Sequence, residues 1–144
     1  MSIPVLRIVP ALLLVTLVSA PSSAEDECKS TFVLPPGVQC TDPDADQIDY
    51  NCPVVWDQIE DCRLNAAYQK LTAVLKSKPT QLEKLRASQR AWIKFRDADV
   101  ALVVTHYDEG GSLGRSIASM QRFRLTRARL QELQERLADS GRWQ

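Results

Sequence analysis

The chain has 144 residues with 18 acidic and 18 basic side chains, and 44 % of it is hydrophobic and 25 % charged. This composition is typical of an ordinary globular domain and excludes wholesale disorder, collagen-like structure and a multi-pass membrane protein. The neutral total also argues against nucleic acid as the main partner, because phosphate recognition normally requires a surplus of Lys and Arg.

The first 24 residues predict a secretory signal peptide. Arg7 supplies the positive start, residues 8–18 form the apolar run, and Ser22 to Ala24 form a cleavage site of small residues. The apolar run is shorter than the roughly 20 residues that a membrane-spanning helix needs, so we expect cleavage after Ala24 and no stable membrane anchor. The expected location of the mature chain is therefore periplasmic or secreted.

Four cysteines follow the signal, and all of them precede residue 63: Cys28, Cys40, Cys52 and Cys62. Export to an oxidising compartment predicts that they form disulfides, and four cysteines permit three pairings. The chain has no Cys-x-x-Cys pair and its single histidine, His106, lies far along the sequence, so neither a metal site nor a cofactor is expected. We therefore predict that disulfides staple the N-terminal segment to the rest of the domain.

Residues 25–52 differ from the rest of the chain in both pattern and charge. Turn-forming residues such as Pro35-Pro36-Gly37 predict irregular structure in this segment. Residues 25–62 hold ten acids and one base, whereas residues 63–144 hold sixteen bases and eight acids. Two explanations remain open: the acidic segment lies across the basic helices and neutralises them, or it attracts a basic partner.

Beyond residue 52 the apolar residues recur every three or four positions, which predicts three helices of about 25 residues each. The first helix begins at Pro53, because proline suits the first helical position, and it ends near Ser77, before Pro79. The second helix begins at a capping box, Thr80 to Glu83, in which the Thr and Glu side chains satisfy free backbone N–H groups.

The third predicted helix runs from about Leu113 to Ala138, with six arginines that face largely outward. Between the second and third helices, the paired Gly110 and Gly111 favour a helix end, and Ser112 is suited to cap the helix that follows. The expected fold is therefore all-α. Residues 53–140 form an antiparallel bundle of three long helices, and residues 25–52 form an irregular segment stapled to it by disulfides.

The sequence offers no convincing catalytic group. His106 has no serine or cysteine nucleophile motif near it. Asp97 and Asp99 point to different sides of a helix, which argues against a glycosidase pair of carboxylates. We therefore expect a binding protein and not an enzyme.

Four motifs follow one another along the chain: Asp61-x-x-Leu64-Asn65-x-x-Tyr68-x-x-Leu71, Leu85-x-x-x-Gln89-x-x-Trp92-x-x-x-Arg96-Asp97, Gly110-Gly111-Ser112 and Thr126-x-x-Arg129. In their order and spacing these motifs together resemble the LprI-type lysozyme inhibitor family of exported bacterial proteins. The resemblance covers roughly residues 40–137, and Cys40 and Cys52 match the family's first two cysteines in their spacing.

The chain departs from the family pattern at two positions. Val100 and Gln121 stand where the family has cysteines, on facing helices of one hairpin, which is what the loss of one disulfide would look like. Cys28 and Cys62 fall outside the family pattern and can supply a replacement. The resemblance therefore favours the pairs Cys40–Cys52 and Cys28–Cys62.

The resemblance implies inhibition of a lysozyme-like muramidase in the cell envelope, which protects peptidoglycan. Such an inhibitor must fill or cover a cleft that contains carboxylates, and a rigid turn between helices suits this because little entropy is lost on binding. Candidate contact residues are those of the turn: Asp108, Glu109, Gly110, Gly111 and Ser112. Animal lysozymes are commonly basic, so Asp42, Asp44 and Asp46 are candidates for a surface that steers the partner.

An alternative hypothesis is a structural or assembly module of the envelope. Its arginine-rich third helix would bind another periplasmic protein or a glycan. Export removes most nucleic-acid targets, and acids such as Glu132 and Glu135 interrupt the arginines, so no nucleic-acid partner is expected. A lysozyme turbidity assay separates this alternative from inhibition.

Six residues of the family pattern are expected to be structural: Asn65, Tyr68, Gln89, Trp92, Arg96 and Asp97. Gln89 and Arg96 lie on the inward face of the second predicted helix, where polar groups need partners if they are buried. We predict that the polar ends of Gln89, Trp92 and Arg96 join in a buried network that also uses Asn65 or Tyr68.

Overall fold

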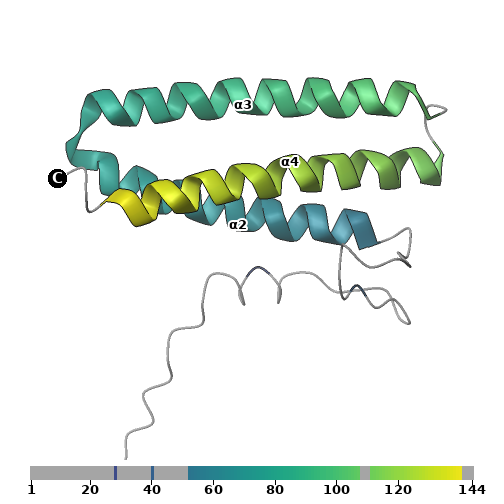
Figure 1. Ribbon diagram of the computed structural model, residues 1–144, viewed down its shortest axis with the longest axis horizontal. Helices are drawn as coiled ribbons and strands as arrows, with labels where there is room; N and C mark the ends of the chain where they lie inside the picture. Colours follow the sequence, from purple (N-terminus) through teal and green to yellow (C-terminus); the bar gives the residue numbers. More distant parts are fainter. Residues whose placement is uncertain (1–27, 29–39, 41–51, 108–110, 141–144) are drawn as a thin grey trace, which may run out of the picture.

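The structure is a computed structural model that describes Cys28, Cys40 and residues 52–107 and 111–140. Three long helices and one short 3-10 helix account for most of these residues: α2 (Cys52–Val74), η1 (Leu75–Ser77), α3 (Pro79–Thr105) and α4 (Ser112–Asp139) (Figure 1). Within these ranges no β-strand occurs. The predicted all-α fold with three long helices is confirmed.

The start of α3 differs from the prediction by one residue, and this removes the expected capping box. Pro79 occupies the first helical position after Lys78, and no side chain caps this end. Proline fits there because its φ angle is already helical and its missing N–H would have had no partner. Thr80 therefore lies inside the first turn, where it cannot act as the cap, and the capping-box prediction is wrong.

α4 lies between α2 and α3 (Figure 1). α2 and α4 run in the same direction and α3 runs against them, as an up-down-up connection requires. η1 turns the chain at one end of the bundle. The end of α3 and the start of α4 lie at the other end, together with the start of α2 (Figure 1).

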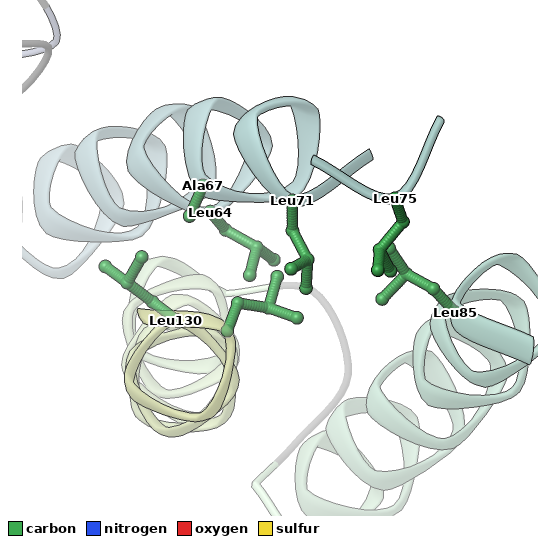
Figure 2. Packing of buried hydrophobic residues seen from close by; sticks show 7 residues of the cluster. Leu64, Ala67, Leu71, Leu75, Leu85 and Leu130 are labelled. Carbon is green, nitrogen blue, oxygen red and sulfur yellow. The ribbon is translucent and has the colours of Figure 1, made fainter. Parts of the chain in front are cut away.

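The main hydrophobic core lies between α2 and α4 and extends to the start of α3. Its leucines interlock from every helix (Figure 2), and its buried members are Leu64, Ala67, Leu71, Leu75, Leu85, Leu130 and Leu133. A second cluster near the start of α2 joins Cys52, Trp56 and Phe123, and the two rings lie 6.1 Å apart between centroids. The apolar residues whose three- and four-residue spacing predicted the helices thus supply the core of α2 and part of the buried face of α4.

α3 is attached much less tightly than the other two helices. Its buried residues are Leu85, Gln89 and Val100, although the helix is 27 residues long. One face of α3 contacts α4, and the rest of the helix is largely exposed to solvent. α2 and α4 therefore form the scaffold to which α3 is added.

Two disulfides join residues of the N-terminal segment to α2. Cys28 is bonded to Cys62 across 34 residues, and Cys40 is bonded to Cys52 across 12 residues. This is the pairing that the family resemblance favours. The candidate steering residues Asp42, Asp44 and Asp46 lie outside the described residues.

Candidate functional site

A polar groove runs between the three helices near the middle of the bundle. It encloses about 460 Å³ and is lined by Asp57, Gln58, Asp61, Cys62, Asn65, Arg96 and Arg122. α2 supplies five of these side chains, α3 supplies Arg96 and α4 supplies Arg122. The first two motifs of the family resemblance therefore meet here, because Asp61 and Asn65 face Arg96 across the groove.

Arg96 is the centre of one hydrogen-bond network in this groove. Its Nη1 donates to Oδ1 of Asp61 at 3.2 Å, and its Nε donates to Oδ1 of Asp97 at 3.0 Å. Asn65 Nδ2 donates to the other Asp61 oxygen at 3.1 Å, and the guanidinium lies 5.0 Å from the ring centroid of Trp92. Asp61 thus links Arg96 with Asn65, and Trp92 contacts Arg96 through the face of its ring. The network is not buried, however, since the Asp61 and Asp97 side chains are about half exposed.

Gln89 belongs to a different network, which corrects the prediction that it joins Arg96. Its Oε1 accepts a hydrogen bond from Arg129 Nε at 3.1 Å. Arg129 also donates to Glu132 at 2.6 Å and to Ser88 Oγ at 2.9 Å. Tyr68 joins neither network among these contacts and packs half-buried against the main core.

The prediction that the arginines of the third helix face largely outward is wrong for Arg129, which is only 6 % exposed. Its position explains this, because Arg129 lies three residues after the buried Thr126 and four before the buried Leu133. The same spacing in the sequence could have placed Arg129 on the inward face. Its burial requires the partner that α3 supplies, Gln89, so the residue holds α3 to α4.

Asp57 is a buried carboxylate that sequence reasoning missed. Arg122 Nη1 donates to its Oδ2 at 3.1 Å, and its Oδ1 has no hydrogen-bond partner within the part of the chain that the structure describes. Burial raises the pKa of Asp57, and the hydrogen bond and charge of Arg122 offset part of this rise. The sequence signal is weak because Asp57 lies in the first turns of a helix, where exposed acids are common.

The turn between α3 and α4 forms the second candidate site. We call its described flanks, residues 102–107 and 111–113, the hairpin tip. Three large apolar side chains of the tip are exposed: Leu102 is 69 %, Tyr107 44 % and Leu113 51 % accessible. His106 and Tyr107 meet edge to face, with 5.3 Å between ring centroids.

Only part of the predicted turn can be placed. Asp108, Glu109 and Gly110 lie outside the described residues. Gly111 precedes α4 with an extended backbone, and Ser112 is the first helical residue, so the prediction that Ser112 caps α4 is wrong. At the end of α3, the backbone N–H groups of His106 and Tyr107 donate hydrogen bonds to the carbonyl oxygens of Val103 and Val104.

A comparison with known families decides what these two sites belong to. The family model described as Lysozyme inhibitor LprI matches residues 56–133, which is more than half of the chain. The chain belongs to the LprI lysozyme inhibitor family. The match begins in the first turns of α2 and ends near the end of α4, so it includes both the polar groove and the hairpin tip. Among curated proteins and solved structures no chain matches it.

Ten of the LprI pattern residues fall into two structural groups. The first group is buried and holds the helices together: Leu64, Leu71, Leu85, Gln89, Thr126 and Arg129. The second group lines or borders the polar groove and comprises Asp61, Asn65, Arg96 and Asp97. The groove's two carboxylates and two guanidinium groups pair with one another: Arg96 with Asp61 joins α3 to α2, and Arg122 with Asp57 joins α4 to α2.

Two further properties of the described residues bear on the chemistry. Cys28, Cys40, 52–107 and 111–140 contain no cluster of three His, Cys, Asp or Glu side chains that could hold a metal ion. In the same part of the chain, no helix combines the length and apolar character needed to cross a membrane.

Proposed function

We propose that this LprI family member is exported, binds a lysozyme-like muramidase in the cell envelope and inhibits it, thereby protecting peptidoglycan. Family membership supports inhibition, and the predicted signal peptide supports export. The observation that carries the choice of surface is the exposure of Leu102, Tyr107 and Leu113 at the hairpin tip. We propose the tip as the contact surface.

The tip has the properties that inhibition of a glycosidase requires. Exposed apolar side chains that lie together mark interaction sites, and tyrosine is common among residues that dominate binding energy. A glycosidase cleft accommodates sugar rings between two carboxyl groups, so an aromatic ring and an imidazole are suitable to fill it. Tyr107 supplies the ring, and the neighbouring His106 supplies an imidazole N–H that can face a carboxylate.

The Cys40–Cys52 disulfide supports a role for the acidic segment. It ties Cys40 to the first residue of α2, and the start of α2 lies at the same end of the bundle as the end of α3 and the start of α4 (Figure 1). In this proposal Asp42, Asp44 and Asp46 attract a basic lysozyme toward that end. Neutralising all three should slow association and weaken its salt dependence, with a smaller effect on dissociation.

The proposal is tested with residues 25–144, the expected mature chain, in a lysozyme turbidity assay. The double variant Tyr107→Ala/Leu113→Ala should weaken inhibition about tenfold or more, because it removes two anchors of the contact. Ile93→Ala/Val74→Ala is the matched control, since these side chains are similarly exposed but lie away from the tip. Circular dichroism should be unchanged for both variants.

The outcomes separate the hypotheses. No inhibition by the unmutated protein at micromolar concentration would overturn the proposal and favour the envelope-assembly module. Inhibition that both double variants retain would remove the tip as the contact surface. The assembly hypothesis has less support in the structure, because Arg122 and Arg129 of α4 bind Asp57 and Gln89 within the domain.

A further inference from the structure

A separate cavity opens at the η1 end of the bundle, far along α4 from its first residues. We call it the η1 pocket. It encloses about 290 Å³ and is lined by Leu71, Leu75, Gln81, Lys84, Leu85, Ser88, Arg129 and Arg136. Neither proposed lysozyme contact, the hairpin tip or the acidic segment, contributes a described residue to it.

The floor of the η1 pocket is apolar. Leu71, Leu75 and Leu85 belong to the main hydrophobic core, and their side chains lie next to one another where α2, η1 and α3 meet (Figure 2). All three residues are at least nine-tenths buried, so the pocket reaches down to the core itself. An apolar group that enters it would be shielded from water on the side of these leucines.

The lining of the pocket is positively charged. Lys84 and Arg136 are exposed at its rim, Arg129 is buried in its wall, and no described lining residue carries a carboxylate. The polar groove, in contrast, contains the carboxylates of Asp57 and Asp61. A third cavity, between α2 and α4, contains the carboxylate of Glu60. Arg129 is paired with Glu132, which does not line the pocket, so Lys84 and Arg136 give the described lining an excess of positive charge that favours an anionic ligand.

Arg129 offers hydrogen-bond donors for an anion in this pocket. Its guanidinium has five N–H groups, and its hydrogen bonds to described residues use three of them, on Gln89, Glu132 and Ser88. Its single carboxylate partner, Glu132, is about half exposed, whereas the Arg129 side chain is almost completely buried. A second carboxylate at the remaining N–H groups would form charge-assisted hydrogen bonds in a shielded place.

We propose that the η1 pocket binds a free carboxylate amphiphile, a short acyl chain that ends in a carboxylate. The acyl chain packs on Leu71, Leu75 and Leu85, and the carboxylate pairs with Arg129 in the wall and Arg136 at the rim. The occupant is a free acid and not the headgroup of a membrane lipid, because the apolar floor is small and enclosed by three helical elements. This inference does not depend on lysozyme inhibition.

Isothermal titration calorimetry with the mature protein tests the charge requirement. The probes are octanoate, octanol and octyltrimethylammonium, which share the chain and differ in the headgroup. Octanoate should bind more tightly than octanol, and the cation should bind most weakly or not at all. Absence of octanoate binding, or equal binding of octanol, would overturn the proposal.

Paired variants test the location. Lys84→Gln/Arg136→Gln removes two rim cations and leaves the core intact, so octanoate affinity should fall about tenfold. Arg90→Gln/Arg124→Gln changes the charge equally at exposed positions outside the pocket and should alter affinity less than about twofold. Equal losses in both variants would show nonspecific attraction and contradict the proposal.

Two further measurements identify the occupant. In methyl NMR spectra, octanoate should shift the signals of Leu71, Leu75 and Leu85 more than that of Leu64, which is buried but does not line the pocket. Sedimentation with phosphatidylglycerol vesicles should show no binding. Vesicle binding without octanoate binding would assign the pocket to a lipid surface, and dimer formation that blocks octanoate would assign it to a second copy.

Discussion

The α2–α4 pair and α3 differ in how they are held in the bundle: the pair by buried side chains, and α3 mainly by polar contacts. α2 and α4 each contribute eight buried residues, whereas α3, of similar length, contributes three. α3 is held by polar contacts, above all Gln89 with Arg129 and Arg96 with Asp61. We infer from this difference that the α2–α4 pair contributes most of the free energy of unfolding. α3 and the hairpin tip can therefore carry exposed apolar side chains without loss of the fold.

The largest expected effect is on the α2–α4 core. Leu133→Ala deletes a fully buried side chain and should lower the free energy of unfolding by about 3 kcal/mol. Val100→Ala truncates a buried side chain of α3 and should cost about 1 kcal/mol, because it removes less apolar surface and α3 buries fewer residues against the bundle. Urea unfolding measures both, and equal losses would contradict the proposed division between scaffold and added helix.

A smaller effect is expected at the buried link between α3 and α4. Gln89→Ala removes the acceptor of Arg129 Nε and leaves a buried guanidinium without one of its partners. This should cost about 1 to 3 kcal/mol in unfolding free energy. The exposed Gln134→Ala serves as the matched control and should stay within about 0.5 kcal/mol of the unmutated protein.

Arg96→Ala should cost less than Gln89→Ala. Both carboxylate partners of Arg96 are about half exposed, so solvent screens the ion pairs and the expected loss is about 1 kcal/mol or less. A double-mutant cycle with Asp61→Ala isolates the pair. Lysozyme inhibition should be retained, and its loss with unchanged stability would move the contact surface from the hairpin tip to the polar groove.

The smallest effect concerns the pH dependence set by Asp57. Burial raises the pKa of this carboxyl above its ordinary value of 3.8, so the folded protein binds the proton more tightly than the unfolded chain. The ionised form therefore opposes folding at neutral pH, and this cost disappears as the pH falls through the folded-state pKa. Relative to Asp57→Asn, the unmutated protein should gain unfolding free energy as the pH is lowered from neutral to about 4. A difference that grows with rising pH would contradict the assignment.

The helices could be predicted because their signals are local. Leucines at three- and four-residue spacing marked the inward faces of α2 and α4, and Pro79 marked the boundary between the first two long helices. The capping box at Thr80 failed because the same proline competes for the helix start. Pro79 therefore decided where α3 begins, and the adjacent Thr80 motif did not.

The parts that could not be predicted depend on contacts between distant residues. Arg129 is buried because Gln89, 40 residues earlier, accepts from it. Asp57 is buried beside Arg122, which follows 65 residues later. The sequence indicated the α3–α4 turn as a candidate site, but the exposure of Leu102 and Tyr107 beside it depends on how little of α3 is covered.

Hydrogen–deuterium exchange with and without lysozyme tests the central claim, that the hairpin tip contacts the enzyme while the α2–α4 pair acts as scaffold. We expect lysozyme to protect peptides that span residues 102–113. Peptides that cover residues 82–96 of α3 and residues 126–139 of α4 should exchange at the same rate with and without the enzyme. Protection of the polar groove without the tip, or no change anywhere in the chain, would contradict this account.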